Sequence, residues 1–341
     1  MANPLAYLKN CGSVDEVAEA ATTALPALQE RCMTAGVAGH QSGLVMSDAV
    51  DALTRRLLEL GEATLGDAPG PFAWLACGSQ GRCEQSLHTD QDNAIIYADD
   101  LPAGADAWFA RLGEFVTHGL AQCGIEHCPG GVGPDHADWR GPQSEWHTAF
   151  RQVIRVPETR SVMLASHYFD LRTIHGDASL LSAIRREALP EAANNRLFIA
   201  KVKQNALRAQ AGIGPWSLWR TPLLGAHRRT LHLKQQGLIP LSQLALAHAL
   251  EAGSPALNTG HRLQAAVAAG RLTPTQCRDL LRARDTVLGL RNRAILDQHA
   301  GGRPLTNRVA LDELSRLERA HLRSSLTVIR DAQSALARDV S

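Results

Sequence analysis

The sequence predicts an α+β or α/β fold, in which a mixed sheet with flanking helices is followed by a C-terminal helical bundle. Between residues 67 and 180, short apolar runs typical of buried strands alternate with stretches of helical periodicity, as in a sheet covered by helices. Over residues 181–341 the chain is rich in Ala, Leu and Arg and keeps a helical period, which favours a bundle. Residues 1–66 are expected to form an N-terminal helical cap.

Bulk composition places the chain among ordinary globular proteins. Its 341 residues suggest two or three folded units, and 45% hydrophobic with 20% charged residues argue against disorder. A net charge of +1 gives no reason to expect nucleic acid or a membrane surface as a partner. No apolar run is long enough to span a membrane, and seven cysteines without a CxxC pair fit free thiols in a reducing cytoplasm.

The cap is expected to contain two helices. Ser13 and Glu16 have the spacing of a capping box, and apolar residues follow at helical intervals. A second helix is expected to begin near Ser47 and to run to about residue 65. The cluster "GDAPGP" at 66–71 breaks the helical pattern and marks a boundary.

Strand and helix signals alternate beyond this boundary. Strands or strand-like runs are expected within 72–79, 93–98, 124–131 and 162–176, and helices within 104–122 and 144–156. In the helical half, loops are expected at 212–216, 251–260 and 300–307.

Two aspartates, Asp90 and Asp92, stand just before the second apolar run. On an extended chain alternate residues point to the same side, so "DQD" sets two carboxylates side by side. Their charges repel unless a cation neutralises them, and a hard divalent ion such as Mg²⁺ takes carboxylate and phosphate oxygens together. A third carboxylate would allow two ions about 3.5–4 Å apart, the arrangement that promotes in-line displacement at phosphorus.

The first apolar run ends in "GSQGR" at 78–82. Glycine lets a backbone approach a phosphate closely, the Ser79 hydroxyl adds a donor, and Arg82 offers a forked guanidinium. No GxxxxGK[ST] pattern occurs, so the turn is not a Walker P-loop. A lone D-x-D or Gly-Ser turn is usually structural. A strand, this turn and a carboxylate pair together describe a site for a nucleoside triphosphate.

With these residues the chain resembles the nucleotidyltransferase superfamily, whose signature is a Gly-Ser turn followed by D-x-D. The segment "WLACGSQGRCEQSLHTDQDNAIIY" (74–97) is most similar to a bacterial family related to the catalytic domain of PII uridylyltransferase and often fused to CBS and cyclic-nucleotide-binding domains. The resemblance extends over most of the chain through "CPGG" (128–131), "YFDLRTIHGD" (168–177), "LHLKQQGLIPL" (231–241) and "NTGHRL" (258–263). It implies a nucleotidyltransferase-fold sheet at 67–180 and a substrate-binding helical domain at 181–341.

The resemblance also implies roles for individual residues. Nucleotide binding is implied for Gly78, Ser79, Arg82 and Lys234, catalysis and ligation of Mg²⁺ (or Mn²⁺) for Asp90, Asp92 and Asp170, and support of the loop for Glu84 and Thr89. Two of these assignments have plain structural alternatives. Asp170 could be a surface aspartate or pair with Arg172, and Lys234 could be a solvated helix lysine.

One segment departs from the resemblance. Where relatives usually read "GGVMASNP" before a tryptophan, this chain has "GGVGPDHADW" at 130–139. The resemblance implies that this segment borders the acceptor pocket, so the choice of acceptor is expected to differ. Trp139 and Trp146 lie nearby and are expected to pack in the core rather than to stack on a base.

Two further groups are expected to be structural. The usual zinc-binding pairs are missing from the cluster Cys123, His127, Cys128 and His136, so reduced thiols and loop histidines are expected there. The basic stretch 220–234, with Arg228, Arg229 and Lys234, is expected to be a solvated helix face. Phosphates or an acidic protein remain alternative partners for it.

The sequence and the resemblance together lead to one functional expectation and two alternatives. We expect a Mg²⁺-dependent enzyme that moves a nucleoside monophosphate from a nucleoside triphosphate, with ATP and UTP as candidate donors, to a hydroxyl of a protein or small molecule, releasing pyrophosphate. One alternative is a catalytically silent nucleotide-binding regulatory protein. The other is a protein-modifying transferase of the toxin–antitoxin type. No motif encodes the base or the acceptor, and a homo-oligomer is left open.

Overall fold

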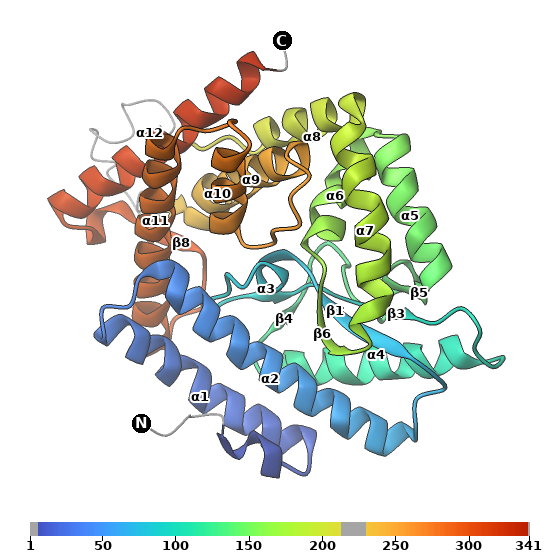
Figure 1. Ribbon diagram of the computed structural model, residues 1–341. Helices are drawn as coiled ribbons and strands as arrows, with labels where there is room; N and C mark the ends of the chain where they lie inside the picture. The colour runs from blue at the N-terminus through green and yellow to red at the C-terminus, as the bar shows by residue number, and fades with distance from the viewer. Residues whose placement is uncertain (1–5, 213–229, 340–341) are drawn as a thin grey trace.

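The computed structural model describes residues 6–212 and 230–339, and Figure 1 shows a sheet between N-terminal and C-terminal helices. The N-terminal helices are η1 (Ala6–Asn10), α1 (Val14–Thr34) and α2 (Gly39–Leu65). The middle of the chain contains β1 (Phe72–Ala76), α3 (Gly78–Gly81), β2 (Asp90–Gln91), β3 (Asn93–Tyr97), α4 (Ala105–Gln122), β4 (Glu126–His127), η2 (Ala137–Trp139), β5 (Arg140–Pro142), α5 (Gln143–Arg155), α6 (Thr159–Asp170) and β6 (Arg172–Gly176). The C-terminal half contains α7 (Ala178–Asn194), α8 (Arg196–Arg208), β7 (Thr230–His232), η4 (Lys234–Leu238), α9 (Ile239–Glu251), α10 (Thr259–Ala268), α11 (Pro274–Ala300), β8 (Arg308–Ala310), η5 (Leu311–Glu313) and α12 (Arg316–Arg338).

The main sheet has four strands in the order β5-β3-β1-β6. β1 lies between β3 and β6 and is antiparallel to both, while β3 and β5 are parallel. Leu75 of β1 is paired with Ala94 of β3 and with Thr173 of β6, and the register with β6 shifts between Trp74 and Leu75. The sheet is therefore mixed, as the sequence predicts. Two short pairs lie outside it, β2 with parallel β4 and β7 with antiparallel β8.

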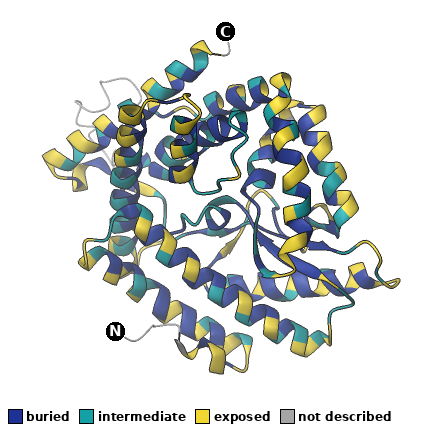
Figure 2. Ribbon diagram, viewed as in Figure 1, coloured by how far each residue is buried: buried dark blue, intermediate teal, exposed yellow. Residues whose placement is uncertain are grey.

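Helices cover both faces of this sheet. Successive residues of each strand point to opposite faces, so each strand contributes to two cores. Trp74 and Ile95 face one side and belong to a core shared with α1, α2 and α4. Leu75 and Ile96 face the other side and pack with α5, α6, α7 and α8. Every residue of β1 and β3 is buried (Figure 2), which explains why these strands read as unbroken apolar runs.

The C-terminal helices α9–α12 pack on one another, and α11 also lies against α1 and α2 (Figure 1). Gly39 permits this close approach, because a Cβ there would lie 2.6 Å from the Cβ of Leu288. His40 adds a polar link, with Nδ1 2.9 Å from Asp285 Oδ1. Within residues 6–212 and 230–339, no helix combines the length and apolar character needed to cross a bilayer.

The cap confirms one expectation and corrects another. The Ser13 side chain caps α1 by accepting from the backbone N–H of Glu16 at 3.2 Å. The Glu16 carboxylate, however, accepts from the backbone N–H of Gly12 rather than from that of Ser13. The second helix begins at Gly39, well before Ser47. Small buried residues such as Gly39 and Ser42 fill its first turns, so the apolar periodicity that would reveal the start is missing there.

The run at 162–176 is half helix and half strand. α6 continues through Asp170, and β6 begins only at Arg172. Val162, Ala165 and Phe169 are buried and lie three and four residues apart, so the apolar run is one face of a helix. The expectation that Asp170 lies on a strand is therefore wrong, because Asp170 is the last residue of α6.

The helix face expected at 220–234 is wrong where the structure describes it, because Thr230–His232 form strand β7. The remaining expected elements agree with the structure. The strands expected within 72–79, 93–98 and 124–131, the helices within 104–122 and 144–156, and the loops at 251–260 and 300–307 are all confirmed, with small shifts in their bounds. The expected loop at 212–216 lies outside the described residues from 213 onward, and so do Arg228 and Arg229 of the basic stretch.

We predict that Gly81→Ala lowers the free energy of unfolding by about 1–3 kcal/mol, the usual cost of overpacking. A Cβ at Gly81 would lie 2.2 Å from the backbone oxygen of Asp170 and 2.9 Å from that of Ala76. Gly289→Ala is the matched control, because a Cβ at that helical position meets no atom within 4 Å and should raise stability by up to about 1 kcal/mol. Chemical denaturation measures both, and equal effects would contradict the prediction.

Candidate active site

The turn that follows β1 lies directly against the aspartate pair. Gly78 is the first residue of α3 and has φ +57°, a backbone conformation that residues other than glycine rarely adopt. A Cβ at Gly78 would lie 2.3 Å from Oδ2 of Asp92, so only glycine allows this approach. The backbone N–H of Cys77 donates to the carbonyl of Asp92 at 2.8 Å and fixes the two segments together. The Gly-Ser turn and the D-x-D segment therefore form one site.

Asp90 and Asp92 differ in how their charge is compensated. Burial raises the pKa of Asp92, and the neighbouring Asp90 charge raises it further, against a hydrogen bond from the Cys128 thiol and the influence of His167. Burial also opposes ionisation of Asp90, but Lys234 holds its pKa below the ordinary value, with Nζ 2.7 Å from Oδ1. Asp92 is thus a buried carboxylate whose charge the described residues compensate only in part.

Two hydroxyls lie beside this pair. Ser79 Oγ and Thr89 Oγ1 are 3.3 Å apart, and the Thr89 hydroxyl also donates to the carbonyl of Asp90 at 3.3 Å. Thr89 is buried, so its contacts hold the end of the loop near the turn. The structure therefore brings together Gly78, Ser79, Thr89, Asp90, Asp92 and Lys234.

Arg82 lies in a separate cluster of buried charges. Its Nε donates to Glu84 Oε2 at 3.0 Å, and its Nη1 pairs with Asp170. Arg262 Nη1 lies 2.7 Å from the other oxygen of Asp170, whose side chain is 3% exposed. Two guanidinium groups therefore neutralise Asp170. The alternative that Asp170 pairs with Arg172 is wrong, because Arg172 pairs with Asp51.

The predicted third metal ligand is thus engaged elsewhere. No group of three His, Cys, Asp or Glu side chains with metal-binding spacing occurs among the described residues. The aspartates at 90 and 92 lie together, whereas Asp170 lies with Arg82 and Arg262. Among the described residues, Cys123, His127, Cys128 and His136 do not form such a group either, and the burial of Cys123 raises the pKa of its thiol to about 12.

The C-terminal half holds the loop that follows the turn. The Glu84 carboxylate accepts from both the backbone N–H of Thr259, at 2.9 Å, and its hydroxyl, at 3.0 Å. The Asn258 amide donates to the carbonyl of Arg82 at 2.9 Å. On the opposite side Gly43 of α2 packs against the loop, where a Cβ would lie 3.1 Å from the Cα of Glu84. Glu84 therefore orders the loop, as the resemblance implies.

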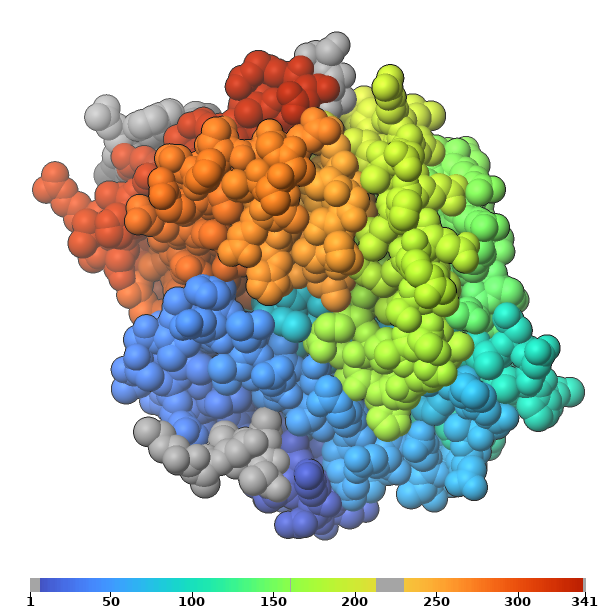
Figure 3. All heavy atoms as spheres, in the orientation of Figure 1, coloured from blue at the N-terminus to red at the C-terminus, as the bar shows by residue number. Residues whose placement is uncertain are grey.

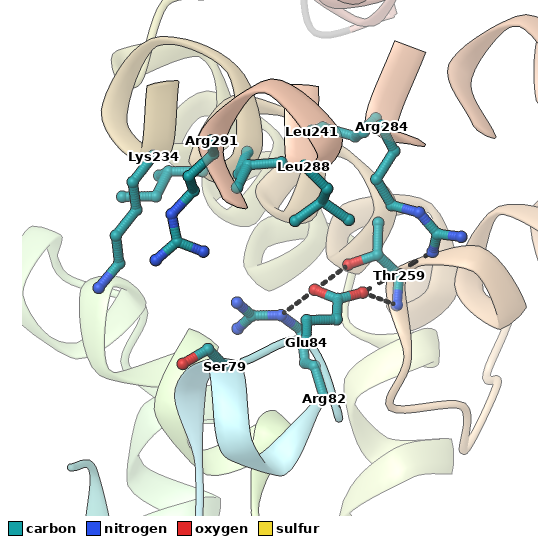
Figure 4. A pocket seen from close by; sticks show the side chains of 11 residues that line it. Ser79, Arg82, Glu84, Lys234, Leu241, Thr259, Arg284, Leu288 and Arg291 are labelled. Atoms are coloured by element: carbon teal, nitrogen blue, oxygen red, sulfur yellow. Dashed lines mark hydrogen bonds and ion pairs between the residues drawn. The ribbon is translucent and has the colours of Figure 1, made fainter. Parts of the chain in front are cut away.

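A pocket with a cavity volume of about 40 Å³ lies between this loop and the C-terminal helices (Figure 4). Ser79 and Arg82 line one wall, and Lys234 and Arg291 reach in from the other. The remaining lining residues are Glu84, Leu238, Ile239, Leu241, Thr259, Arg284 and Leu288. In the space-filling view only a small part of the cyan segment after β1 is visible, between blue α2 and the orange C-terminal helices (Figure 3).

Comparison with family models identifies the family of the chain. Residues 23–160 match the model described as "Putative nucleotidyltransferase DUF294", and residues 196–340 match the model described as "Putative nucleotidyltransferase substrate binding domain". The chain belongs to this nucleotidyltransferase family. No curated protein matches the chain. The expected family and fold class are both confirmed.

The pocket of this nucleotidyltransferase draws on both matched segments. Ser79 and Arg82 belong to the nucleotidyltransferase model, and Lys234 and Arg291 to the substrate-binding model. Asp170 lies between the two matched ranges. The site is therefore shared between the sheet and the helical half of the family fold.

Several site residues were missed from the sequence. His167 and Cys128 influence Asp92, and Arg284 and Arg291 line the pocket. One signal could have found the arginines, because they are seven residues apart on a helix and interrupt its buried face. Thr259 stands in the "NTGHRL" motif, but its partner, Glu84, cannot be inferred from spacing.

The segment at 130–139 borders a second, smaller pocket. This pocket has a cavity volume of about 30 Å³ and is lined by Gln91, Thr117, His127, Cys128, Gly131, Val132, Gly133, Asp135 and His136. Trp139 and Trp146 are buried and pack with Tyr168, and Trp146 donates to the carbonyl of Ile95 at 3.0 Å. Both tryptophans are core residues, as expected.

We predict opposite stability changes for the two aspartates in metal-free buffer. Asp92→Asn should raise the free energy of unfolding at pH 7, because it removes a buried charge whose pKa is raised. Asp90→Asn should lower the free energy of unfolding by about 1 kcal/mol, because it removes the partner of Lys234.

The pH dependence follows from the sign of each shift. The gain from Asp92→Asn should shrink as pH falls through the raised pKa of Asp92, where the wild-type carboxyl becomes neutral. The loss from Asp90→Asn should persist until pH falls below the ordinary carboxyl range, because the folded-state pKa of Asp90 is lowered. Denaturation with urea and a chelator at several pH values measures both. A loss of stability in Asp92→Asn at pH 7 would contradict this account.

Proposed function

We propose that this chain transfers a nucleoside monophosphate from a nucleoside triphosphate to a hydroxyl of a protein or small molecule, with release of pyrophosphate and dependence on Mg²⁺. The observation that carries the proposal is the contact between the Gly78 turn and the Asp92 carboxylate, next to a cation-lined pocket. The contact places a phosphate-binding turn beside the aspartate pair. The match to the family supports the same chemistry at a coarser level.

The residues present fit a divalent ion. Asp90 and Asp92 would hold Mg²⁺, or Mn²⁺ in its place, because hard cations prefer oxygen ligands. The raised pKa of Asp92 supports this assignment, since a buried carboxylate with incomplete compensation gains most from a bound cation. When bound, the ion would supply charge neutralisation at the phosphate oxygens. Asp170 would be free to join only if Arg82 and Arg262 released it, so the proposal gives Asp170 a positioning role.

The protein's own groups supply orientation and positive charge. The α3 turn would present the Ser79 hydroxyl and backbone N–H groups to the triphosphate. In the transfer, the acceptor oxygen bonds to the α-phosphorus as the bond to the β-bridging oxygen breaks, pyrophosphate leaves, and the hydroxyl proton is released. Lys234 Nζ lies 2.7 Å from Asp90 Oδ1, where its positive charge can neutralise either this carboxylate or a phosphate. Positioning and charge stabilisation are the main contributions expected of a protein in phosphorus transfer.

The resemblance suggests the donor, and the second pocket suggests the place of the acceptor. The similarity to the PII uridylyltransferase catalytic domain favours UTP or ATP as the donor. The pocket beside Cys128 and His136 is our proposed place for the acceptor, because it lies next to the carboxylate to which Cys128 donates.

We predict Mg²⁺-dependent binding of one nucleoside triphosphate by the wild-type chain, lost in Asp92→Asn. Calorimetry with ATP, UTP, GTP and CTP, with and without Mg²⁺, measures it. Transfer of the α-phosphate label to an acceptor should fall by at least about a hundredfold in the same variant. Asp100→Asn is the control, since Asp100 is exposed in the loop after β3. Full binding and transfer by Asp92→Asn would overturn the site assignment.

One observation favours a second candidate, a nucleotide-binding regulatory protein without turnover. Asp170, the expected third carboxylate, is held by two arginines, which leaves Asp90 and Asp92 as the available pair. Tight nucleotide binding without release of pyrophosphate, in the presence of cell extract as a source of acceptor, would select this candidate. Release of pyrophosphate would exclude it.

A further inference from the structure

The wall of this pocket opposite Ser79 carries two buried arginines from α11. Arg284 and Arg291 are 5% and 4% exposed, and their spacing of seven residues places them on one face of the helix, two turns apart. Burial of a guanidinium is costly unless an anion neutralises it. The partners of these two side chains therefore indicate what the pocket is built to bind.

Arg291 forms no ion pair with a carboxylate among the described residues, although the charge of Asp90 acts on it and favours its charged form. Its Nε donates to the Asn307 amide oxygen at 2.6 Å and its Nη2 to the carbonyl of His88 at 2.9 Å, both neutral acceptors. Within the described part of the chain its Nη1 makes no hydrogen bond, and Figure 4 shows the guanidinium pointing into the pocket. Burial lowers the pKa of Arg291 to about 10, so the side chain is still a cation at neutral pH.

Arg284 is only weakly compensated. Its Nη1 lies 3.8 Å from Glu84 Oε1 and 3.4 Å from the Asn258 amide oxygen. Its Nε is buried without a hydrogen bond among the described residues, and its nearest carboxylate oxygen there, Asp285 Oδ1, is 3.9 Å away. Glu84 is already shared with Arg82 and with Thr259. Gly260 makes room for the guanidinium, because a Cβ there would lie 2.8 Å from Nη1 of Arg284.

The charges around the pocket do not balance. Four of the side chains that line it are cations, Arg82, Lys234, Arg284 and Arg291, and one is an anion, Glu84. Asp170 and Asp90 neutralise Arg82 and Lys234 from outside the lining. The excess positive charge therefore lies on the α11 wall and faces the pocket.

We propose that Arg291 and Arg284 form a receptor for the pyrophosphate end of the donor nucleotide, its β- and γ-phosphates, with Lys234 at its edge. The proposal rests on the proposed function and deepens it. It assigns the leaving group to the helical half of the chain, the part whose family model is described as substrate binding. The α-phosphate would then lie toward Ser79 and the aspartate pair, and the donor would bridge the two halves of the molecule.

Free pyrophosphate without metal is the direct probe of this receptor. Calorimetry of the full chain in a chelating buffer should show binding of pyrophosphate, and Arg291→Gln should weaken it by about tenfold or more, the usual effect of losing a charged hydrogen bond. Arg291→Lys should keep part of the affinity, because it keeps the charge. Arg278→Gln is the control on the same helix, since Arg278 is exposed and, within the part of the chain that the structure describes, its side chain bonds only to Thr275.

The outcomes separate this inference from the proposed function. Wild-type affinity in a folded Arg291→Gln variant, or equal weakening in the Arg278 control, would overturn the receptor, and so would absence of pyrophosphate binding by the wild-type chain. Asp92→Asn should bind pyrophosphate as well as the wild type does. If nucleotide transfer is absent while Arg291-dependent pyrophosphate binding is present, the proposed function fails and the anion site stands.

Discussion

The Arg82 guanidinium, held between Glu84 and Asp170, is the interaction on which the rest of the site depends. Each of these carboxylates is also held by the C-terminal half, Glu84 by Thr259 and Asp170 by Arg262. The loop after the Gly-Ser turn is thereby joined to α10. Loss of one partner would leave an uncompensated buried charge, which typically costs about 3–5 kcal/mol. The cluster therefore fixes one wall of the pocket relative to the other.

Close backbone approach is the second constraint, and glycines meet it. Gly78 lets the turn touch Asp92, Gly81 lets it pack on the end of α6, and Gly260 gives room to Arg284. Each contact brings a polar group into a buried site. Electrostatic interactions are strong there, and leaving the group unpaired costs free energy. The excess cations of the pocket and the Asp92 carboxylate, whose pKa is raised, would both be stabilised by a metal-bound nucleotide. The phosphates would neutralise the cations, and the metal would neutralise the carboxylate.

The sequence predicts those parts of the site whose signals are local. Twenty-odd consecutive residues encode β1, the Gly-Ser turn and the Asp90 and Asp92 pair. Because β1 and β3 are buried on both faces, they appear in the sequence as unbroken apolar runs. Long-range partners carry no such signal. Asp170 was expected on a strand because its apolar neighbours read as one, and its pairing with Arg262 depends on how α6 meets α10. The position of Arg291 in the pocket likewise depends on how α11 packs, although its spacing of seven residues from Arg284 is a local signal that both lie on one buried face.

The central claim is that one nucleotide binds across the two halves of this molecule, with its metal at the aspartate pair and its phosphates against α11. A crystal structure with Mn²⁺ and a nucleoside triphosphate whose α–β bridge cannot be cleaved tests it most directly, since Mn²⁺ gives an anomalous signal. The account predicts that signal between Asp90 and Asp92, with the terminal phosphates within hydrogen-bond distance of Arg291. A metal bound elsewhere, or terminal phosphates turned away from α11, would contradict it.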